Sequence, residues 1–468
     1  MKVNTLLLLL FFNVSLFFNS CIKQKENLNI NINGVWIQEG YGRILLIKDS
    51  IYTYYNTTES SCLPLIENGV LTDRFSLVEL KDNNLILNPG GIVDYRFKRT
   101  SILPEKCESI NLTLDHSPQN NFNVLWNTFN SHYAFFNERG IDWNEIKEQS
   151  DSRLKNIKSD KQLYDYFTEI FKPFNDGHIK LDVPDSLITL KNFIRDSKNI
   201  KTKDEVIKDI LSNYVSNVES YNKGTVQWGI LNGENIGYLV ITDMNNFSNY
   251  ISDTDLSKSQ FWDEYDNILE TKSGLEQLND ELKGVDYIME KILNDFSKTE
   301  SVIIDLRFNG GGYETVALKT LSHFVNEPKH ILSIKAKKGD GYTEEQKYIL
   351  YPSKNQYKGR VSLLTSYNTA SAAEIFVLGA KAYPQIKRFG SSTNGVFSEI
   401  LWKNLPNGWE FSLSNEVYSD PNGNTYETTG IPVNYEIEYS KNRALFFNSF
   451  YRENEIKDVG IEKIITFY

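Results

Sequence analysis

Residues 302–312 read Val-Ile-Ile-Asp-Leu-Arg-Phe-Asn-Gly-Gly-Gly, and this stretch decides the fold. A short run that is almost continuously apolar is typical of a strand buried on both faces of a parallel sheet. The three glycines that follow allow the backbone to adopt positive φ and to approach a ligand closely. Backbone N–H groups in such a turn can bind an oxyanion. A plain tight turn between a strand and a helix would explain the glycines equally well.

Strands and helices alternate on both sides of this stretch. Residues 236–241 and 361–365 form apolar runs of strand length, whereas 287–296 and 372–382 have the pattern of helices. Alternating elements with continuous apolar strands predict an α/β domain. The glycines are not a phosphate-binding loop, because the Gly-Lys-Ser/Thr ending is absent.

The segments that precede this domain have other patterns. Between residues 34 and about 100, short β-branched and aromatic runs alternate with Asn, Asp and Gly turns, which predicts a small all-β domain. Apolar residues at helical spacing follow from residue 122. Residues 186–225 and 252–298 are highly charged with sparse apolar positions, so we expect surface helices or a lid there.

Composition excludes some classes of function. The 468 residues suggest two or three domains, and 40% hydrophobic content argues against global disorder. The net charge of −11 argues against nucleic-acid binding, which requires clustered Lys and Arg. It also provides no basic patch for anionic lipid.

The N-terminus has the pattern of an export signal. A basic start at Lys2 precedes an apolar run over residues 6–12 and the sequence Asn19-Ser20-Cys21. The apolar stretch is too short to span a membrane. Asn-Ser-Cys resembles a bacterial lipoprotein cleavage box, in which Cys21 would be lipidated. Phe18 stands where Leu is usual, and an ordinary signal peptide is the alternative interpretation.

The other two cysteines are Cys62 and Cys107. An exported protein with two remaining cysteines permits one disulfide, and two buried thiols are the alternative. Histidines and cysteines are too few in any one segment to predict a structural metal site.

Two further residues have a chemical interpretation beside a structural one. Ser371 stands at the predicted start of a helix, where it could be an N-cap or a nucleophile whose oxyanion is bound by the N–H of Ala372. His178 follows Asp176-Gly177 in a turn, where it could be structural or a general base.

Taken together, four motifs resemble the tricorn and C-terminal processing peptidases of family S41. They are Asp-Gly-His at 176–178, Asp-Leu-Arg-Phe-Asn-Gly-Gly-Gly at 305–312, Ser-Ala-Ala-Glu at 371–374, and Gly-x-x-Thr-x-Gly at 390–395. They occur in the order and approximate spacing of that family, over residues 120–440. The resemblance implies a ClpP/crotonase-like α/β peptidase core with a helical cap and a small N-terminal all-β domain.

The resemblance also distinguishes two catalytic arrangements. In the Ser-Lys branch of the family a lysine follows Thr-x-Gly, but this chain has Val396 there. The tricorn-like branch uses Ser, His and Glu, and Ser371 and His178 fit that pattern. Its glutamate lies in a Tyr-Glu-x-x-Gly-x-Pro segment, which matches Glu427. Val433 stands where the family commonly has Asp, a departure outside the triad.

The function implied is serine endopeptidase activity on exported or unfolded proteins and peptides. His178 would take the proton of Ser371, Glu427 would orient His178, and the amides of Gly311 and Ala372 would form the oxyanion hole. No metal or organic cofactor is implied. We expect a peptide or unfolded-protein partner, no nucleic acid, and contact with the membrane through the lipid anchor only, on the periplasmic side or the cell surface. The oligomeric state is left open.

Two alternative functions remain. A catalytically silent lipoprotein could bind a peptide or ligand on the same fold, or the β domain could dock a partner or glycan.

The sequence therefore predicts six segments. They are a lipoprotein signal peptide at 1–20, a tether at 21–33, the β domain at 34–104, a helical segment carrying the catalytic histidine at 110–185, a charged helical cap with the first core strand at 186–300, and the peptidase core at 301–468.

Overall fold

The computed structural model describes residues 31–108, 115–188, 201–252, 255–453 and 455–468. The chain divides into two compact units, Met1–Ile32 and Asn33–Tyr468, and every helix and strand below belongs to the second. The predicted signal peptide, Cys21 and most of the predicted tether lie outside the described residues. Within the described part of the chain, no helix has both the length and the apolar character needed to cross a bilayer.

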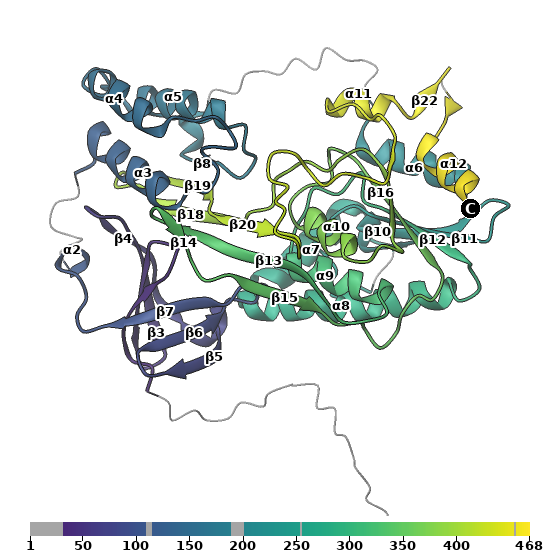
Figure 1. Cartoon of the computed structure of the whole chain (residues 1–468), viewed down its shortest axis with the longest axis horizontal. Coiled ribbons are helices and arrows are strands. Elements are labelled where there is room, and N and C mark those ends of the chain that lie inside the picture. Colours follow the sequence, from purple (N-terminus) through teal and green to yellow (C-terminus); the bar gives the residue numbers. More distant parts are fainter. Residues whose placement is uncertain (1–30, 109–114, 189–200, 253–254, 454) are drawn as a thin grey trace, which may run out of the picture. The chain divides into compact units, whose positions relative to one another are not determined.

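A seven-stranded sheet forms the centre of the α/β domain, and its buried strand β12 is the one expected from residues 302–306 (Figure 1). Strands β11, β12, β16, β17 and β21 are parallel to one another, whereas β10 is antiparallel to both β9 and β11. In spatial order the strands are β21 (Tyr435–Glu436), β17 (Lys387–Gly390), β16 (Arg360–Thr365), β12 (Ser301–Asp305), β11 (Ile236–Ile241), β10 (Val226–Leu231) and β9 (Val215–Tyr221).

Both faces of this sheet are covered, which explains why its strands are apolar throughout. On β12, Val302 and Ile304 pack into the core formed with α8 (Gly274–Asp295), α9 (Glu314–Leu321) and α10 (Ala372–Lys381). Ile303 points to the opposite face, toward α6 (Lys203–Tyr214), α11 (Arg443–Asn448) and α12 (Val459–Phe467). This alternation is the consequence of the two-residue period of a strand. The predicted α/β class is confirmed.

The N-terminal domain is a second seven-stranded sheet in which all neighbours are antiparallel. Its core contains Trp36, Tyr54 and Phe97. A disulfide joins Cys62 on β4 to Cys107 on the short helix α2 (Glu105–Glu108), with the two Cα atoms 5.0 Å apart. The spatial order is β4 (Cys62–Val70), β3 (Ile51–Thr57), β2 (Arg43–Lys48), β1 (Gly34–Gln38), β7 (Tyr95–Thr100), β6 (Asn84–Asn88) and β5 (Ser76–Lys81).

A third group of elements surrounds His178. Three helices, each capped by a Ser or Asp side chain, share an aromatic-rich core with a small sheet. They are α3 (Pro118–His132), α4 (Trp143–Leu154) and α5 (Asp160–Phe171), and the sheet is β18 (Ile400–Asn404), β19 (Glu410–Ser414) and β8 (Leu181–Asp182). The remaining elements are α1 (Leu71–Arg74), α7 (Lys258–Glu270), β13 (Lys329–Lys338), β14 (Gly341–Tyr342), β15 (Gln346–Leu350), β20 (Glu416–Ser419), β22 (Tyr451–Arg452), β23 (Glu455–Ile456) and the 3₁₀ turns at 172–174, 185–187, 222–224 and 322–324.

Two expectations for the charged segments are wrong. Residues 215–221 form the edge strand β9 rather than a helix, and its exposed polar side chains explain why the sequence lacks a strand pattern there. Helix α8 is not a surface lid, because Val285, Ile288 and Ile292 are fully buried against the sheet. Its apolar residues recur at positions that form one narrow stripe, which the surrounding charges conceal in the composition.

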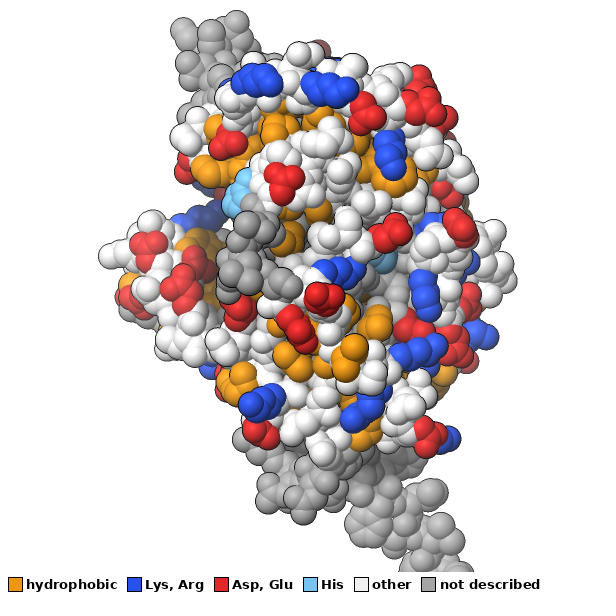
Figure 2. Space-filling model, turned by 90° about the vertical axis from the view of Figure 1, so that its left-hand side faces the viewer, with side chains coloured by type: hydrophobic (Ala, Val, Ile, Leu, Met, Phe, Trp, Pro, Cys, Tyr) orange, Lys and Arg blue, Asp and Glu red, His pale blue; other side chains and the backbone are white. Residues whose placement is uncertain are grey.

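The charged side chains on one face of the molecule are of mixed sign (Figure 2). On the face shown in Figure 2, Lys and Arg side chains are interspersed with Asp and Glu. That face has no continuous basic surface of the kind that binds a phosphate backbone.

Candidate active site

Ser371 lies between strand β16 and helix α10, in an unusual backbone conformation. Its φ is 53° and its ψ is −126°, a combination that costs a residue with a Cβ of order 1–3 kcal/mol. Ser371 and Glu374 form the capping-box pattern of a helix start, in which Glu374 accepts the Ser371 N–H. Capping does not account for the positive φ, because an N-cap residue normally has an extended backbone. A serine held in a strained turn between a strand and a helix is the geometry of an exposed nucleophile.

Glu374, one turn into α10, holds this serine turn against a neighbouring loop. Its Oε1 accepts the N–H of Gly395 at 2.7 Å, and its Oε2 accepts the N–H of Val396 at 2.8 Å and that of Ser371 at 3.2 Å. The N–H of Ser371 also donates a hydrogen bond to the carbonyl of Val396 at 3.1 Å. Burial raises the pKa of Glu374 to about 7, and its hydrogen bonds oppose the shift. Glu374 is therefore a positioning residue.

The glycine turn at 310–312 lies directly beside Ser371. Gly311 has φ 116°, and a Cβ on it would lie 2.7 Å from the Cβ of Ser371, so only glycine fits. The serine loop is tied to the turn by the Ala370 N–H, which donates to the Asn309 carbonyl at 3.2 Å. The N–H of Gly311 donates to Asn309 Oδ1 at 2.9 Å. The donor expected for the oxyanion hole is thus engaged within the turn.

The strand end before the turn is fixed by a buried ionic cluster. Arg307 is fully buried, and its Nη2 lies 2.5 Å from Asp305 Oδ2 and 2.6 Å from Asp458 Oδ2. Tyr238 donates to Asp305 at 2.6 Å, and Arg307 donates to Tyr439 Oη at 2.9 Å. These contacts give Asp305 and Arg307 a structural role at the start of the glycine turn.

His178 is held by its backbone, and its imidazole is buried. Its N–H donates to Asp176 Oδ1 at 2.9 Å, and Ser412 Oγ donates to its carbonyl at 2.7 Å. Nδ1 of His178 has no hydrogen-bond partner among the described residues. Burial lowers the pKa of His178 to about 4; Asp176 opposes the shift, and Lys180 increases it. The imidazole is therefore neutral near pH 7, the state that can accept a proton.

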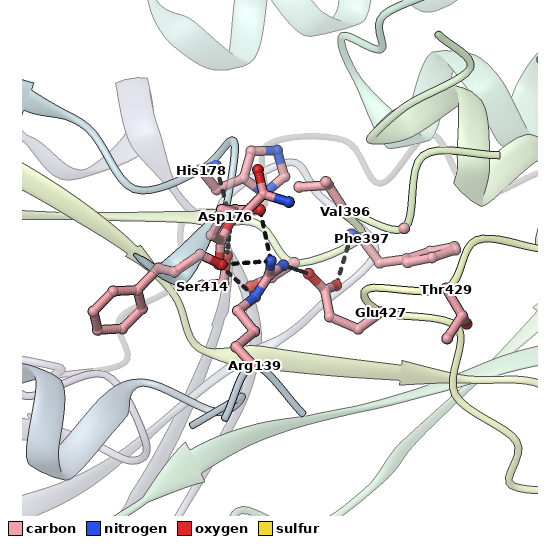
Figure 3. Close-up of polar contacts among 12 residues, drawn as sticks. Arg139, Asp176, His178, Val396, Phe397, Ser414, Glu427 and Thr429 are labelled. Carbon is pink, nitrogen blue, oxygen red and sulfur yellow. Dashed lines mark hydrogen bonds and ion pairs between the residues drawn. The ribbon is translucent and has the colours of Figure 1, made fainter. Parts of the chain in front are cut away.

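Glu427 and Asp176 lie on either side of Arg139 (Figure 3). Arg139 Nη2 is 2.9 Å from Glu427 Oε1, and its Nε is 3.7 Å from Asp176 Oδ2. The other oxygen of Glu427 accepts the N–H of Phe397 at 2.9 Å. Burial and the Asp176 carboxylate raise the pKa of Glu427 to about 8, while Phe397 and Arg139 oppose the shift.

One loop connects the serine to the glutamate. Val396 accepts the Ser371 N–H, and the next residue, Phe397, donates to Glu427. The structure therefore brings Ser371 and Gly311 into contact, and it places Glu427 in one network with Asp176. Among the described residues, no hydrogen bond joins Ser371 to His178 or His178 to Glu427. Val396 itself is buried, at the position where the Ser-Lys branch would require a lysine.

Sequence reasoning missed three residues that form this site. Arg139, Tyr133 and Ser414 all contact Asp176, with Tyr133 Oη at 3.0 Å and Ser414 Oγ at 3.2 Å. They are separated from Asp176 by 37, 43 and 238 residues. No local pattern indicates such partners, because the fold alone brings them together.

Comparisons with known proteins cover this site in part. The peptidase family S41 model matches residues 235–437, and the tricorn protease C1 domain model matches residues 115–172. Ser371, Gly311 and Glu427 lie inside the first match. His178 lies six residues beyond the second.

Two curated relatives are similar to part of the chain. The "Probable CtpA-like serine protease" of Staphylococcus epidermidis (strain ATCC 12228 / FDA PCI 1200) is 25% identical over 164 residues, which cover 34% of this chain and 33% of the relative. That of Staphylococcus haemolyticus (strain JCSC1435) is 27% identical over 137 residues, 29% of this chain and 27% of the relative. The chain thus spans about a third or less of the length of these relatives.

A solved structure extends the likeness to the fold. The crystal structure of "a putative peptidase from Parabacteroides merdae ATCC 43184" superposes with a TM-score of 0.54 at 20% identity. The match covers 75% of this chain and 97% of that one. With the family model matched over the strand, the glycine turn and the serine helix, the resemblance inferred from the motifs is confirmed, and residues 235–437 of this chain match peptidase family S41.

Proposed function

We propose that this chain is a serine peptidase that hydrolyses peptide bonds by acyl transfer, with Ser371 as the nucleophile. The observation that carries the proposal is the strained conformation of Ser371 directly beside Gly311. A serine that only caps a helix normally has an extended backbone, so capping does not account for the positive φ of Ser371. Backbone strain of this kind clusters at functional sites.

His178 acts as the base in this proposal. It accepts the proton of Ser371 Oγ–H while Oγ bonds to the substrate carbonyl carbon, and it returns that proton to the leaving amine as the C–N bond breaks. Water then hydrolyses the ester by the reverse sequence of proton transfers. The lowered pKa of His178 keeps the imidazole neutral, and so able to accept a proton, over the physiological pH range.

Glu427 completes the triad as the group that orients His178. The structure supports an indirect form of this role, because Glu427 bonds to Arg139 and Phe397 while Asp176 contacts the backbone of His178. Binding of a substrate would bring Ser371 and His178 into hydrogen-bond distance, since catalytic hydrogen bonds are often long before substrate binds.

The oxyanion would be bound by two amides at the serine turn. Ala372 is the first residue of α10, so its N–H has no partner within the helix. Gly311 is the second donor, and a substrate oxygen would compete with Asn309 Oδ1 for its N–H. Loss of one such donor typically reduces the rate by roughly 10²–10³-fold.

The substrates proposed are unfolded proteins or peptides outside the cytoplasm. Export and lipidation at Cys21 are supported by the sequence of the first 21 residues. Metabolic labelling with a radioactive fatty acid tests the anchor: we expect wild type to incorporate label and Cys21→Ala to incorporate none. Equal labelling of both proteins would exclude lipidation at this cysteine.

Hydrolysis of unfolded casein by the purified chain tests the activity. We expect wild type to cleave casein, and Ser371→Ala and His178→Ala each to reduce the rate by at least roughly 10³-fold. A folded wild type that binds casein without cleaving it would contradict the proposal and support the silent binding protein instead.

A further inference from the structure

Glu314 is a buried carboxyl group for which the proposed chemistry has no use. It is the first residue of α9 and lies three residues after Gly311. Its side chain is only 6% exposed, although it is ionisable. A buried carboxyl group is costly unless its oxygens find partners, so the contacts of Glu314 indicate what the protein gains from it.

The partners of Glu314 come from two other parts of the chain. Its Oε1 accepts the N–H of Ile92 at 2.9 Å, and its Oε2 accepts from Tyr418 Oη at 3.0 Å. Ile92 lies between β6 and β7 of the N-terminal sheet, whereas Tyr418 lies on β20 of the peptidase domain. A Cβ on Gly91 would lie 3.0 Å from Glu314 Oε1, so this loop approaches the carboxyl group closely.

The same tyrosine continues the network to a second carboxyl group. Tyr418 Oη lies 3.0 Å from Glu416 Oε2, and Glu416 Oε1 accepts from Tyr41 Oη at 2.5 Å. Tyr41 belongs to the N-terminal domain, which therefore contacts the network at two points. The N–H of Glu416 donates to Ser398 Oγ at 3.0 Å, one residue from the Phe397 amide that binds Glu427.

The hydrogen bonds of this network require one more proton than it would hold with both Glu314 and Glu416 ionised. Tyr418 has a single O–H, yet its oxygen lies 3.0 Å from a carboxyl oxygen of both Glu314 and Glu416. A tyrosine hydroxyl can donate only one hydrogen bond. The second contact is satisfied only if one of the two carboxyl groups is protonated and donates to Tyr418 Oη.

The surroundings favour that extra proton. Burial raises the pKa of both Glu314 and Glu416, and the nearby Glu399 carboxylate raises that of Glu314 further. Besides these groups, the titratable side chains around Glu314 are those that line the adjacent cavity of about 260 Å³, Arg74, Tyr95 and Tyr313, together with Tyr348 of β15.

We propose that Glu314 is a positioning residue through which the N-terminal β domain holds the glycine turn of the peptidase, by way of a proton shared with Tyr418 and Glu416. The inference rests on the proposed function for its kinetic consequences. The turn is fixed on one side by Met244, whose carbonyl accepts the Tyr313 N–H at 3.0 Å. Glu314 fixes the other side. A shift of about 1 Å at this turn is enough to cost roughly 10²-fold in rate.

The sign of the pH dependence follows from the shared proton. As the pH rises and the proton is lost, two buried carboxylates face one hydroxyl, and their repulsion releases Glu314 from its partners. Activity should therefore fall at alkaline pH. In Glu314→Gln, the amide oxygen can accept from Ile92 and the amide nitrogen can donate to Tyr418, so the network needs no extra proton.

The kinetic test compares three variants over pH 6 to about 10. Glu314→Ala should lower kcat by about tenfold or more with little change in KM, because the turn and not the substrate cleft is disturbed. Glu314→Gln should keep kcat near the wild-type value, and the pH at which activity is lost should be higher than in wild type by at least about one pH unit. Glu290→Gln, an exposed carboxyl on α8, is the matched control and should behave as wild type. An alkaline limb that is identical in wild type and Glu314→Gln would overturn the shared-proton mechanism.

Hydrogen exchange provides a readout that needs no turnover. Ile92→Pro removes the one N–H that the β domain donates to Glu314, while Asp94 still binds Gln346 through two hydrogen bonds of 2.9–3.0 Å. We expect faster amide exchange over residues 309–317 in Ile92→Pro and Glu314→Ala, and no change in Ile92→Ala. Unchanged exchange in both would refute the inference even if the enzyme is active. Faster exchange in a chain that hydrolyses nothing would support the role of Glu314 in holding the glycine turn. The same result would contradict the proposed function.

Discussion

Gly311→Ala is the substitution whose effect the structure defines most closely. The added Cβ would lie 2.7 Å from Ser371 Cβ, 3.0 Å from the Ala370 carbonyl oxygen and 3.2 Å from the Ala372 nitrogen. Ordinary contacts of a Cβ begin near 3.4 Å, so the serine and the turn must separate by about 0.7 Å. The φ of 116° adds strain, because an L-residue rarely adopts it.

The expected loss is large for catalysis and small for stability. A displacement approaching 1 Å between nucleophile and oxyanion donor should cost roughly 10²-fold in kcat/KM. The backbone strain should cost of order 1–3 kcal/mol in the free energy of unfolding. The assay is kcat/KM on a fluorogenic peptide identified from the casein digest, together with thermal unfolding of each variant.

Gly310→Ala is the matched control for this prediction. Gly310 lies one residue earlier in the same turn, and a Cβ on it would meet nothing within 4 Å. It should retain kcat/KM within a few-fold of wild type. The reasoning is refuted if folded Gly311→Ala is as active as Gly310→Ala, because the close approach of the turn to Ser371 would then have no role in catalysis.

Three further predictions concern charge and stability. The acid limb of kcat/KM should lie near pH 4, where His178 gains its proton. Because Arg139 lowers the pKa of His178, this limb should move to higher pH in Arg139→Met but hardly in Arg139→Lys. Coincident acid limbs in wild type and both variants would contradict this. Replacing both Cys62 and Cys107 by Ala should reduce the free energy of unfolding by about 4 kcal/mol, from the 45-residue separation that the disulfide closes, and chemical denaturation with an unchanged midpoint would count against it. Arg307→Met leaves two buried carboxylates unpaired and should cost about 3–5 kcal/mol in the same measurement, so a fully stable variant would show that the cluster is dispensable.

Much of the peptidase core could be predicted from local sequence. The strand before the glycine turn is largely apolar because both of its faces are buried, and that property is visible in the three consecutive residues Val302, Ile303 and Ile304. The positions of Ser371 and Gly311 follow from the same rule, since a strand, a turn and a helix fix where their side chains emerge. Strand β9 was not predicted, and the burial of helix α8 was missed, because polar residues dominate the composition of both elements.

The electrostatic part of the site could not be predicted in this way. Arg139 reaches Glu427 across 288 residues, and Glu314 reaches Ile92 across 222. Neither pair has a periodic pattern or a motif. Long-range partners of this kind are determined by the packing of separate elements, so they become visible only in three dimensions.

Reaction of the purified chain with a fluorophosphonate, followed by mass spectrometry of the labelled peptide, tests the central claim most directly. We expect one modified residue, Ser371, and no labelling in Ser371→Ala or His178→Ala, because an unactivated serine does not react with this reagent at a useful rate. Labelling at another serine, or none on a folded wild type, would contradict the assignment of Ser371 as the nucleophile.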